Sequence, residues 1–317
     1  MRRPMRALAM LLATATLVTA ACGGDDDDDD TTTGDEGARE AIDGPAVNIG
    51  AQDFGESAIL AQIYQQALTG AGIDASVAEV GGFRDLLFAA FESGDVNLAP
   101  DYVASQLEFL NDGAGEATSD VDETFALLEP LLAERDLVGL TPSDAVDTNA
   151  FVVTQETADE LGLETLSDLA EKGQDLTLGG FQDCEENAFC IPGLERVYGL
   201  DLSGSFTPLD NAVVGDTLAS GEIDVAVLTT TDGRIEDEGW VLLEDDQKML
   251  AADNVFPVLT QELVDAYGDD LTGVLDEVNG NLTTEGLIEL NKRYDVDKDD
   301  AEDIAADWLD DAGISGA

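Results

Sequence analysis

The sequence predicts an α/β protein made of two lobes, and three observations support this prediction. From residue 47 onward, short apolar stretches alternate with segments in which apolar residues recur at helical spacing. Residues 90–99 and 218–226 repeat one pattern, in which a helix end is followed by a glycine and a buried strand. The length of 317 residues is also typical of two domains.

The elements of the first half begin with a strand at 47–50. Ile59, Ile63 and Ala67 share one helical face, and Gly70 ends that helix. The remaining elements of this half are a strand at 76–80, a helix at 83–93, a strand at 96–99, helices at 105–111 and 121–134, and a strand at 137–141. Alternation of this kind predicts parallel sheets flanked by helices.

The second half continues the alternation and ends in a helical stretch. Its elements are a strand at 150–154, a helix at 161–171, a strand at 176–179, a helix at 213–220, a strand at 223–228 and mostly helix over 261–312. Polar loops follow the two repeated strands, at 100–102 and 229–233. Because open α/β sheets bind ligands beyond the carboxyl ends of their strands, we expect these loops to face a cleft. The repeated pattern is also common at ordinary helix–strand junctions, so that alternative stays open.

The charge balance excludes several classes of function. The chain has 70 acidic and 13 basic residues, no histidine, and a formal charge of −57. Without imidazole, serine–histidine catalysis and histidine-ligated metals are excluded. Nucleic acid is not an expected partner, because phosphates are bound by clustered lysines and arginines. We expect no metal and no cofactor, and we interpret the acidic surface as an adaptation to a saline, halophilic habitat.

Residues 1–21 have the pattern of a lipoprotein signal peptide. Three arginines precede an apolar stretch at 7–20, which is too short to span a membrane in the mature protein. The run Thr19-Ala20-Ala21-Cys22 resembles a bacterial lipobox, so Cys22 is the predicted lipidation site. The alternative is plain secretion, with Cys22 near an ordinary cleavage site.

Residues 22–46 are predicted to form an acidic, disordered tether. Six consecutive aspartates at 25–30 repel one another, and the segment has little apolar surface to bury. No later stretch approaches about 18 apolar residues, so we expect no membrane-spanning helix in the mature protein. The expected location is the outer face of the cytoplasmic membrane, extracellular or periplasmic, where a lipid anchor holds the folded part.

Two further cysteines, Cys184 and Cys190, lie close together in the sequence. In an exported chain, such a pair is expected to form one disulfide that stiffens a small loop. A catalytic thiol pair is the alternative, although the spacing is not the CxxC of redox enzymes.

A set of short segments, taken in order, resembles one known family. The segments are 52–60, 90–96, 100–102, 166–170, 231–235, 243–246, 257–258, 282–285 and 290–291. They resemble the substrate-binding proteins of glycine betaine/choline ABC importers, which bind osmoprotectants. The resemblance covers nearly all of residues 47–314, and its specificity comes from the order and spacing of the pieces rather than from any one of them.

The resemblance implies a fold, a partner and a mode of action. The fold is that of a type II periplasmic binding protein, with two α/β lobes joined by two crossover segments. Lobe one would be 47–148 plus 253–317, and lobe two would be 149–252. The protein would not be an enzyme. It would be a monomer that closes on a small osmolyte by a hinge motion and docks to an ABC permease in the membrane.

The resemblance also implies a ligand site between the lobes. A quaternary ammonium group has no N–H to donate, so aromatic faces and carboxylates hold it. At positions where family members often carry cage tyrosines, this chain keeps Tyr102 but has Asn149, Thr229 and Asp253 elsewhere. The candidate ligand-binding residues are Asp53, Phe54, Glu56, Phe83, Asp101, Tyr102, Asn149, Thr229, Thr230, Asp232 and Asn254.

These candidates divide by the ligand that they suit. Phe54, Phe83 and Tyr102 would supply a partial aromatic wall, with negative charge from the nearby aspartates. Asn149, Thr229, Thr230 and Asn254 would instead hydrogen-bond a different small polar solute, such as an amino acid or another osmolyte. Each candidate also has a purely structural alternative, for example a helix cap for Asp53 or Glu56 and a turn for Asp232.

Two other classes of function compete with a binding protein. A secreted enzyme would need a serine–lysine or carboxylate scheme, and the lysines of this chain lie in hydrophilic segments. A cell-surface structural or adhesion protein is the other alternative. A cleft walled by aromatic and polar side chains distinguishes a solute receptor from a structural protein.

Overall fold

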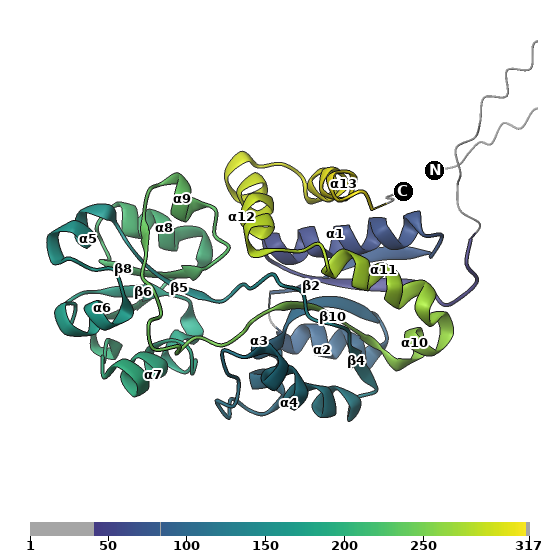
Figure 1. Cartoon of the computed structure of the whole chain (residues 1–317), viewed down its shortest axis with the longest axis horizontal. Helices are drawn as coiled ribbons and strands as arrows, with labels where there is room; N and C mark the ends of the chain where they lie inside the picture. Colours follow the sequence, from purple (N-terminus) through teal and green to yellow (C-terminus); the bar gives the residue numbers. More distant parts are fainter. Residues whose placement is uncertain (1–40, 83, 315–317) are drawn as a thin grey trace, which may run out of the picture. The chain divides into compact units, whose positions relative to one another are not determined.

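The computed structural model describes residues 41–82 and 84–314, which contain two five-stranded sheets (Figure 1). Both sheets are mixed, whereas the alternation of elements predicted parallel ones. The first sheet has the order β2-β1-β3-β10-β4, and the second has the order β7-β6-β8-β5-β9. One strand of each sheet, β10 or β5, runs antiparallel to its two neighbours.

The first sheet is covered by helices on both faces. Its strands are β1 (Val47–Gln52), β2 (Ala75–Gly81), β3 (Leu98–Tyr102), β4 (Leu137–Gly139) and β10 (Val255–Thr260). Its helices are α1 (Gly55–Gly70), α2 (Arg84–Ser93), α3 (Val103–Leu110), α4 (Val121–Ala133), α10 (Gln261–Tyr267), α11 (Asp269–Asn279), α12 (Thr284–Lys292) and α13 (Ala301–Ala312).

Alternation along the strands explains why this sheet has two cores. Val255 and Leu259 of β10 pack with α1, α11, α12 and α13, while Phe256 and Val258 pack with α2, α3 and α4. Successive strand residues point to opposite faces, so one strand serves both cores. Figure 1 shows α1 and α13 on one side of the sheet and α2 and α4 on the other.

The second sheet is built from shorter pieces. Its strands are β5 (Asn149–Val153), β6 (Leu178–Gly180), β7 (Phe206–Pro208), β8 (Val225–Thr229) and β9 (Val241–Leu242). Its α-helices are α5 (Gln155–Leu161), α6 (Leu166–Lys172), α7 (Ile191–Gly193), α8 (Asn211–Ala219) and α9 (Arg234–Asp237). Helix α8 packs on one face of the sheet, and residues of α5, α6 and α7 belong to the core of the other face.

Two connections join the sheets, a first connection at 140–148 and a second connection at 243–254. They run antiparallel where Val146 bridges Asn254. The Asp147 N–H donates to the Asp253 carbonyl at 3.0 Å, and the Val255 N–H donates to the Ala145 carbonyl at 3.0 Å. This short paired stretch brings Asp147 and Asp253 side by side.

Several elements differ from the sequence-based expectation. The helix expected at 161–171 begins only at Leu166, as α6, because Gly162 adopts a left-handed conformation with φ +65° and ends the preceding helix α5 at Leu161. Strand β3 runs through Pro100 to Tyr102, residues that were expected to form a loop. Strand β10 was not predicted at all.

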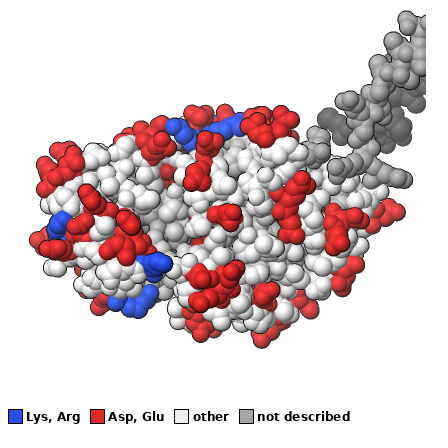
Figure 2. Space-filling view, in the orientation of Figure 1, with Lys and Arg blue, Asp and Glu red and all other residues white. Residues whose placement is uncertain are grey.

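Three further features concern the surface and the cysteines. Acidic side chains are spread over the face shown in Figure 2, where basic ones are few. A disulfide joins Cys184 and Cys190, whose Cα atoms are 5.1 Å apart. Within the described part of the chain, no helix combines the length and the hydrophobicity needed to cross a bilayer.

Candidate functional site

A cavity of about 630 Å³ opens between the two sheets and their connections. Residues at the start of α1, around β5 and β8, and on both connections line it. Carboxylates, amides, hydroxyls and aromatic rings share its wall. This mixture suits a small ligand that carries both charge and apolar surface.

Glu56 occupies the start of α1 with its side chain buried. The turn that places it is fixed by Ser57, whose Oγ accepts the Gln52 N–H at 2.9 Å. The Tyr102 hydroxyl donates to Glu56 Oε1 at 2.7 Å, and the Thr231 hydroxyl lies 2.9 Å from Oε2. Glu56 therefore links the first lobe to the loop after β8 in the second. Burial raises the pKa of this carboxyl above its ordinary value, although the hydrogen bonds oppose the shift.

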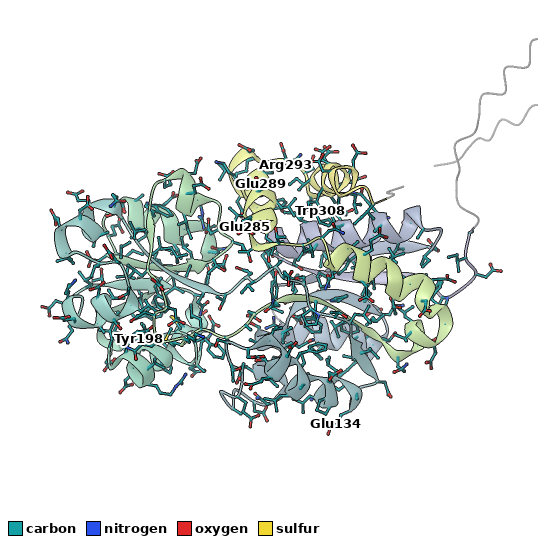
Figure 3. All side chains as sticks on the ribbon, viewed as in Figure 1. Glu134, Tyr198, Glu285, Glu289, Arg293 and Trp308 are labelled. Atoms are coloured by element: carbon teal, nitrogen blue, oxygen red, sulfur yellow. A yellow bond between two sulfur atoms is a disulfide. The ribbon has the colours of Figure 1, made fainter. Side chains whose placement is uncertain are left out.

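Helix α12 adds an amide to this cluster. Leu287, Leu290 and Asn291 are on its buried side, while Glu285 and Glu289 face away from the core (Figure 3). The Asn291 side-chain amide donates to Glu56 Oε2 at 2.6 Å and to the Thr231 carbonyl at 3.2 Å. Its Oδ1 is buried and accepts no hydrogen bond from any described residue.

Asp147, on the first connection, is the second carboxyl of the cavity and is half-buried. Its Oδ1 lies 2.8 Å from the Thr231 hydroxyl, the same oxygen that contacts Glu56. Burial raises the pKa of Asp147 well above its ordinary value, and the negative charge of Glu56 raises it further.

Asp253, on the second connection, is the third carboxyl that faces the cavity. It accepts the Ser105 N–H at 2.8 Å and the Ser105 hydroxyl at 2.5 Å, both at the start of α3. Burial raises its pKa to about 6, against the effect of these two hydrogen bonds. Three acidic side chains, one buried and two half-buried, thus face one cavity from three parts of the chain.

Basic groups also reach the cavity, although the chain has few of them. Arg84 forms an ion pair with Asp101 at 2.7 Å, and Arg234 forms one with Asp232 at 2.6 Å. With Lys298, three of the thirteen lysines and arginines line this wall. Arg84 uses Nε and Nη2 for Asp101, and its Nη1 donates to no described residue. The cavity therefore offers donors for an anionic group as well as acceptors for a cation.

Aromatic rings form the apolar part of the wall. Phe54 and Tyr102 lie together, with ring centroids 6.3 Å apart and planes tilted by 34°. Phe181 and Phe189 line the cavity from the second lobe, where the Phe189 carbonyl accepts the Asn149 side-chain amide at 3.2 Å. Two lobes thus contribute aromatic surface to one cavity.

The family model for the substrate-binding domain of ABC-type glycine betaine transport systems matches residues 45–311. The chain belongs to this family. It is accordingly a substrate-binding protein of an ABC importer and not an enzyme, as the resemblance implied.

Individual relatives agree with this assignment. This substrate-binding protein is 28% identical over 273 residues to a glycine-betaine-binding protein of Pseudomonas aeruginosa, over 83% of this chain and 86% of that protein. It is 24% identical over 274 residues to the carnitine transport binding protein OpuCC of Listeria monocytogenes, and the match covers 83% of this chain and 85% of that protein. A crystal structure described as a glycine betaine/carnitine/choline ABC transporter matches with a TM-score of 0.73 and 25% identity, over 84% of this chain and 99% of that one. The predicted two-lobed fold is confirmed.

Most candidates that the sequence suggested line the cavity of this substrate-binding protein. They are Asp53, Phe54, Glu56, Tyr102, Asn149, Thr229 and Asp232. Phe83 and Cys22 lie outside the described residues.

Three candidates do not line the cavity, and each has a structural reason. Asp101 is fully buried beneath Arg84 and holds that guanidinium in place. The Thr230 hydroxyl accepts the Thr148 N–H at 3.0 Å. The Asn254 amide donates to the Ser143 carbonyl at 2.8 Å, so it stabilises the paired connections.

Sequence reasoning missed several lining residues. Thr231 lies inside the polar loop 229–233, Arg84 follows the candidate Phe83, and Asp147 comes two residues before Asn149, so including every polar residue within two positions of a candidate would have found them. Ser105, Asn291, Phe181 and Phe189 carried no such signal, because their part in the cavity depends on how distant segments pack.

Proposed function

We propose that this protein captures a glycine betaine/choline-type compatible solute by hinge closure of its lobes and delivers it to a membrane permease. The observation that carries the proposal is the set of acidic groups that line the cavity, the buried Glu56 and the half-buried Asp147 and Asp253, beside the rings of Phe54 and Tyr102. A trimethylammonium group is large, positive and without N–H donors, so it needs acidic and aromatic surface rather than hydrogen-bond acceptors. The lobes would be 47–148 plus 253–317 and 149–252, with the two connections as the hinge.

The basic groups refine the solute class. Glycine betaine and carnitine carry a carboxylate as well as a quaternary ammonium group, whereas choline has only the cation and a hydroxyl. Arg84 and Arg234 on the same wall suit that carboxylate. We therefore expect zwitterions to bind more tightly than choline.

A different small polar solute is the second candidate. Asn149, Thr229 and Asp253 stand where aromatic cage residues are frequent in the family, and all three line the cavity. An amino acid or another polar osmolyte would use these groups.

Calorimetric titration of the purified protein in high salt decides between the two. The panel is glycine betaine, carnitine, choline, ectoine and a set of neutral amino acids, with Arg84→Gln as the matched variant. The proposal predicts binding of glycine betaine and carnitine, and a selective loss of these two in Arg84→Gln. Binding of amino acids alone would favour the second candidate.

The proposed location is the outer face of the cytoplasmic membrane. A signal peptide at 1–21, a lipid on Cys22 and an acidic tether at 22–46 would hold a monomeric receptor near its permease. Radiolabelled fatty acid should enter the wild-type protein and not Cys22→Ser. Equal labelling of both proteins, or of neither, would contradict the anchor.

A further inference from the structure

One buried hydroxyl contacts two carboxyls in the cavity wall, the buried Glu56 and the half-buried Asp147. Thr231 Oγ1 lies 2.9 Å from Glu56 Oε2 and 2.8 Å from Asp147 Oδ1, and Thr231 is fully buried. A threonine hydroxyl carries one proton, which it can donate to one carboxylate only. An ionised carboxylate has no proton to offer in return, so the other contact would set two acceptors against each other. The two contacts together require one further proton, on Glu56 or on Asp147.

The hydrogen bonds indicate which carboxyl is charged. Glu56 receives the Tyr102 hydroxyl at 2.7 Å and the Asn291 amide at 2.6 Å in addition to Thr231, and such donors stabilise the ionised form. Beyond the Thr231 hydroxyl, the one donor to the Asp147 carboxyl within the described part of the chain is the Thr231 N–H, at 3.4 Å. The arrangement that satisfies every group has Thr231 donating to an ionised Glu56, and a protonated Asp147 donating to Thr231 Oγ1.

The surrounding titratable groups favour this extra proton. Asp253 faces Asp147 from the second connection, Asp295 faces Glu56 from the turn after α12, and Tyr102 reaches Glu56 from β3. Each of them is neutral or negative. Burial and these charges raise the pKa of both carboxyls.

The basic groups of the cavity do not offset this effect. Arg84 is paired with Asp101 and Arg234 with Asp232, and the Lys298 ammonium group donates to the Asp295 carbonyl. Among the described residues, none of the three forms an ion pair with Glu56 or Asp147.

We propose that Asp147 holds a proton in the solute-free protein and releases it when a cationic solute occupies the cavity, which rests on the proposed function. In the solute-free protein, the proton on Asp147 prevents repulsion between the Glu56 and Asp147 carboxylates. A positive group of the solute beside them takes over this role. The O–H bond of Asp147 breaks, its electron pair stays on the carboxylate, and the proton passes to the solvent. Because a quaternary ammonium group has no proton to exchange, its affinity rises about tenfold per pH unit while Asp147 stays protonated in the free protein.

Calorimetry in buffers of different ionisation enthalpy measures this release directly. Glycine betaine and choline are the probes, at about pH 7, where Asp253 with its pKa of about 6 is mostly ionised. We expect the wild type to release a number of protons that approaches one per bound solute, and Asp147→Asn to bind more weakly, with a binding heat that does not depend on the buffer. Asparagine keeps the shape of Asp147 and can donate its amide to Thr231 Oγ1. A wild-type binding heat that is the same in every buffer overturns the proposal.

A ligand-free measurement separates this inference from the proposed function. The carbonyl stretch of a protonated carboxyl should be present in the infrared spectrum of the solute-free protein at about pH 7. It should be lost in Asp147→Asn and retained in Asp253→Asn, with thermal unfolding as the check that each variant is folded. A spectrum without that band, or a band unchanged in Asp147→Asn, overturns the proposal. If the band is present but neither solute binds, the solute class fails and the proton site stands.

Discussion

At Glu56, three donors from three parts of the chain converge on one buried carboxylate. Tyr102 comes from β3, Asn291 from α12 and Thr231 from the loop after β8. A buried donor that loses its acceptor keeps the full penalty of desolvation. Removal of Glu56 should therefore destabilise the protein mainly because it leaves these three buried donors without an acceptor.

Glu56→Ala should destabilise the protein by about 2–5 kcal/mol, because it leaves several buried donors without an acceptor. Glu56→Gln keeps the shape and one acceptor oxygen, so its loss should be smaller. Urea unfolding of both variants at constant salt measures the difference. Equal stability of Glu56→Ala and wild type would show that the cluster carries no stability.

The Asp253 carboxyl should make the stability of the protein depend on pH. Its pKa of about 6 in the folded protein exceeds the ordinary value of 3.8, so the folded state binds the proton more tightly than the unfolded state. The stabilisation that protonated Asp253 gives is therefore fully present below about pH 4 and is lost as the pH rises to about 6. The free energy of unfolding should fall by an amount on the order of 3 kcal/mol across this range. The stability of wild type relative to Asp253→Asn should fall across that window. A difference that does not vary between pH 4 and pH 7 would contradict the burial of this carboxyl.

At the scale of elements, helix α12 and the loop before α9 hold the lobes together beside the cavity. The Asn291 amide donates to the Thr231 carbonyl, and the Lys292 ammonium group pairs with Asp237 at 2.7 Å. Gly233 lies directly against α12, since a Cβ atom there would be 2.7 Å from the Lys292 Cβ and 2.9 Å from its Cα. This contact has room only for glycine.

Gly233→Ala should therefore push α12 away from the second lobe and weaken closure. We expect a larger radius of gyration by small-angle scattering and weaker solute binding than in the wild type. Gly273→Ala is the control, because that glycine of α11 has open space around it and alanine is the better helix former. A scattering curve and an affinity for Gly233→Ala that match those of Gly273→Ala would argue against the contact.

The elements also show what sequence patterns can predict. Strands β1, β2 and β8 and helices α1, α2 and α8 follow from periodicity and glycine stops, because each is a local feature. Strand β10 escapes such reasoning because Pro257 interrupts its pattern, and it is a strand only through antiparallel pairing with β3 and β4. Sequence patterns also fail to predict that the sheets are mixed, because the direction in which strands pair depends on segments that are distant in the sequence.

At the scale of the whole molecule, the dominant property is a formal charge of −57. Self-repulsion of this size destabilises the compact state, and salt reduces it because the Debye length falls from about 10 Å at 0.1 M to about 3 Å at 1 M. We expect the free energy of unfolding in urea, an uncharged denaturant, to rise steeply with sodium chloride up to at least about 1 M. A stability that does not depend on salt would contradict the interpretation of a saline habitat.

The candidate site could be predicted only in part at this scale. Residues at or just beyond the ends of strands, such as Phe54, Tyr102 and Thr229, were found because strand ends are where α/β sheets bind ligands. Ser105 and Asn291 come from helices whose approach to the cavity depends on the packing of the whole fold. Sequence spacing does not contain that information.

We expect the cavity to recognise the positive charge of its solute. Glycine betaine and 3,3-dimethylbutyrate have nearly the same shape and the same carboxylate, but carbon replaces the quaternary nitrogen in the second. Calorimetric titration of the wild-type protein with both compounds in high salt compares the two affinities. Glycine betaine should bind at least about tenfold more tightly, because cation–π and Coulomb attraction are absent from the isostere. Equal binding of the two compounds, or binding of the isostere alone, would contradict it.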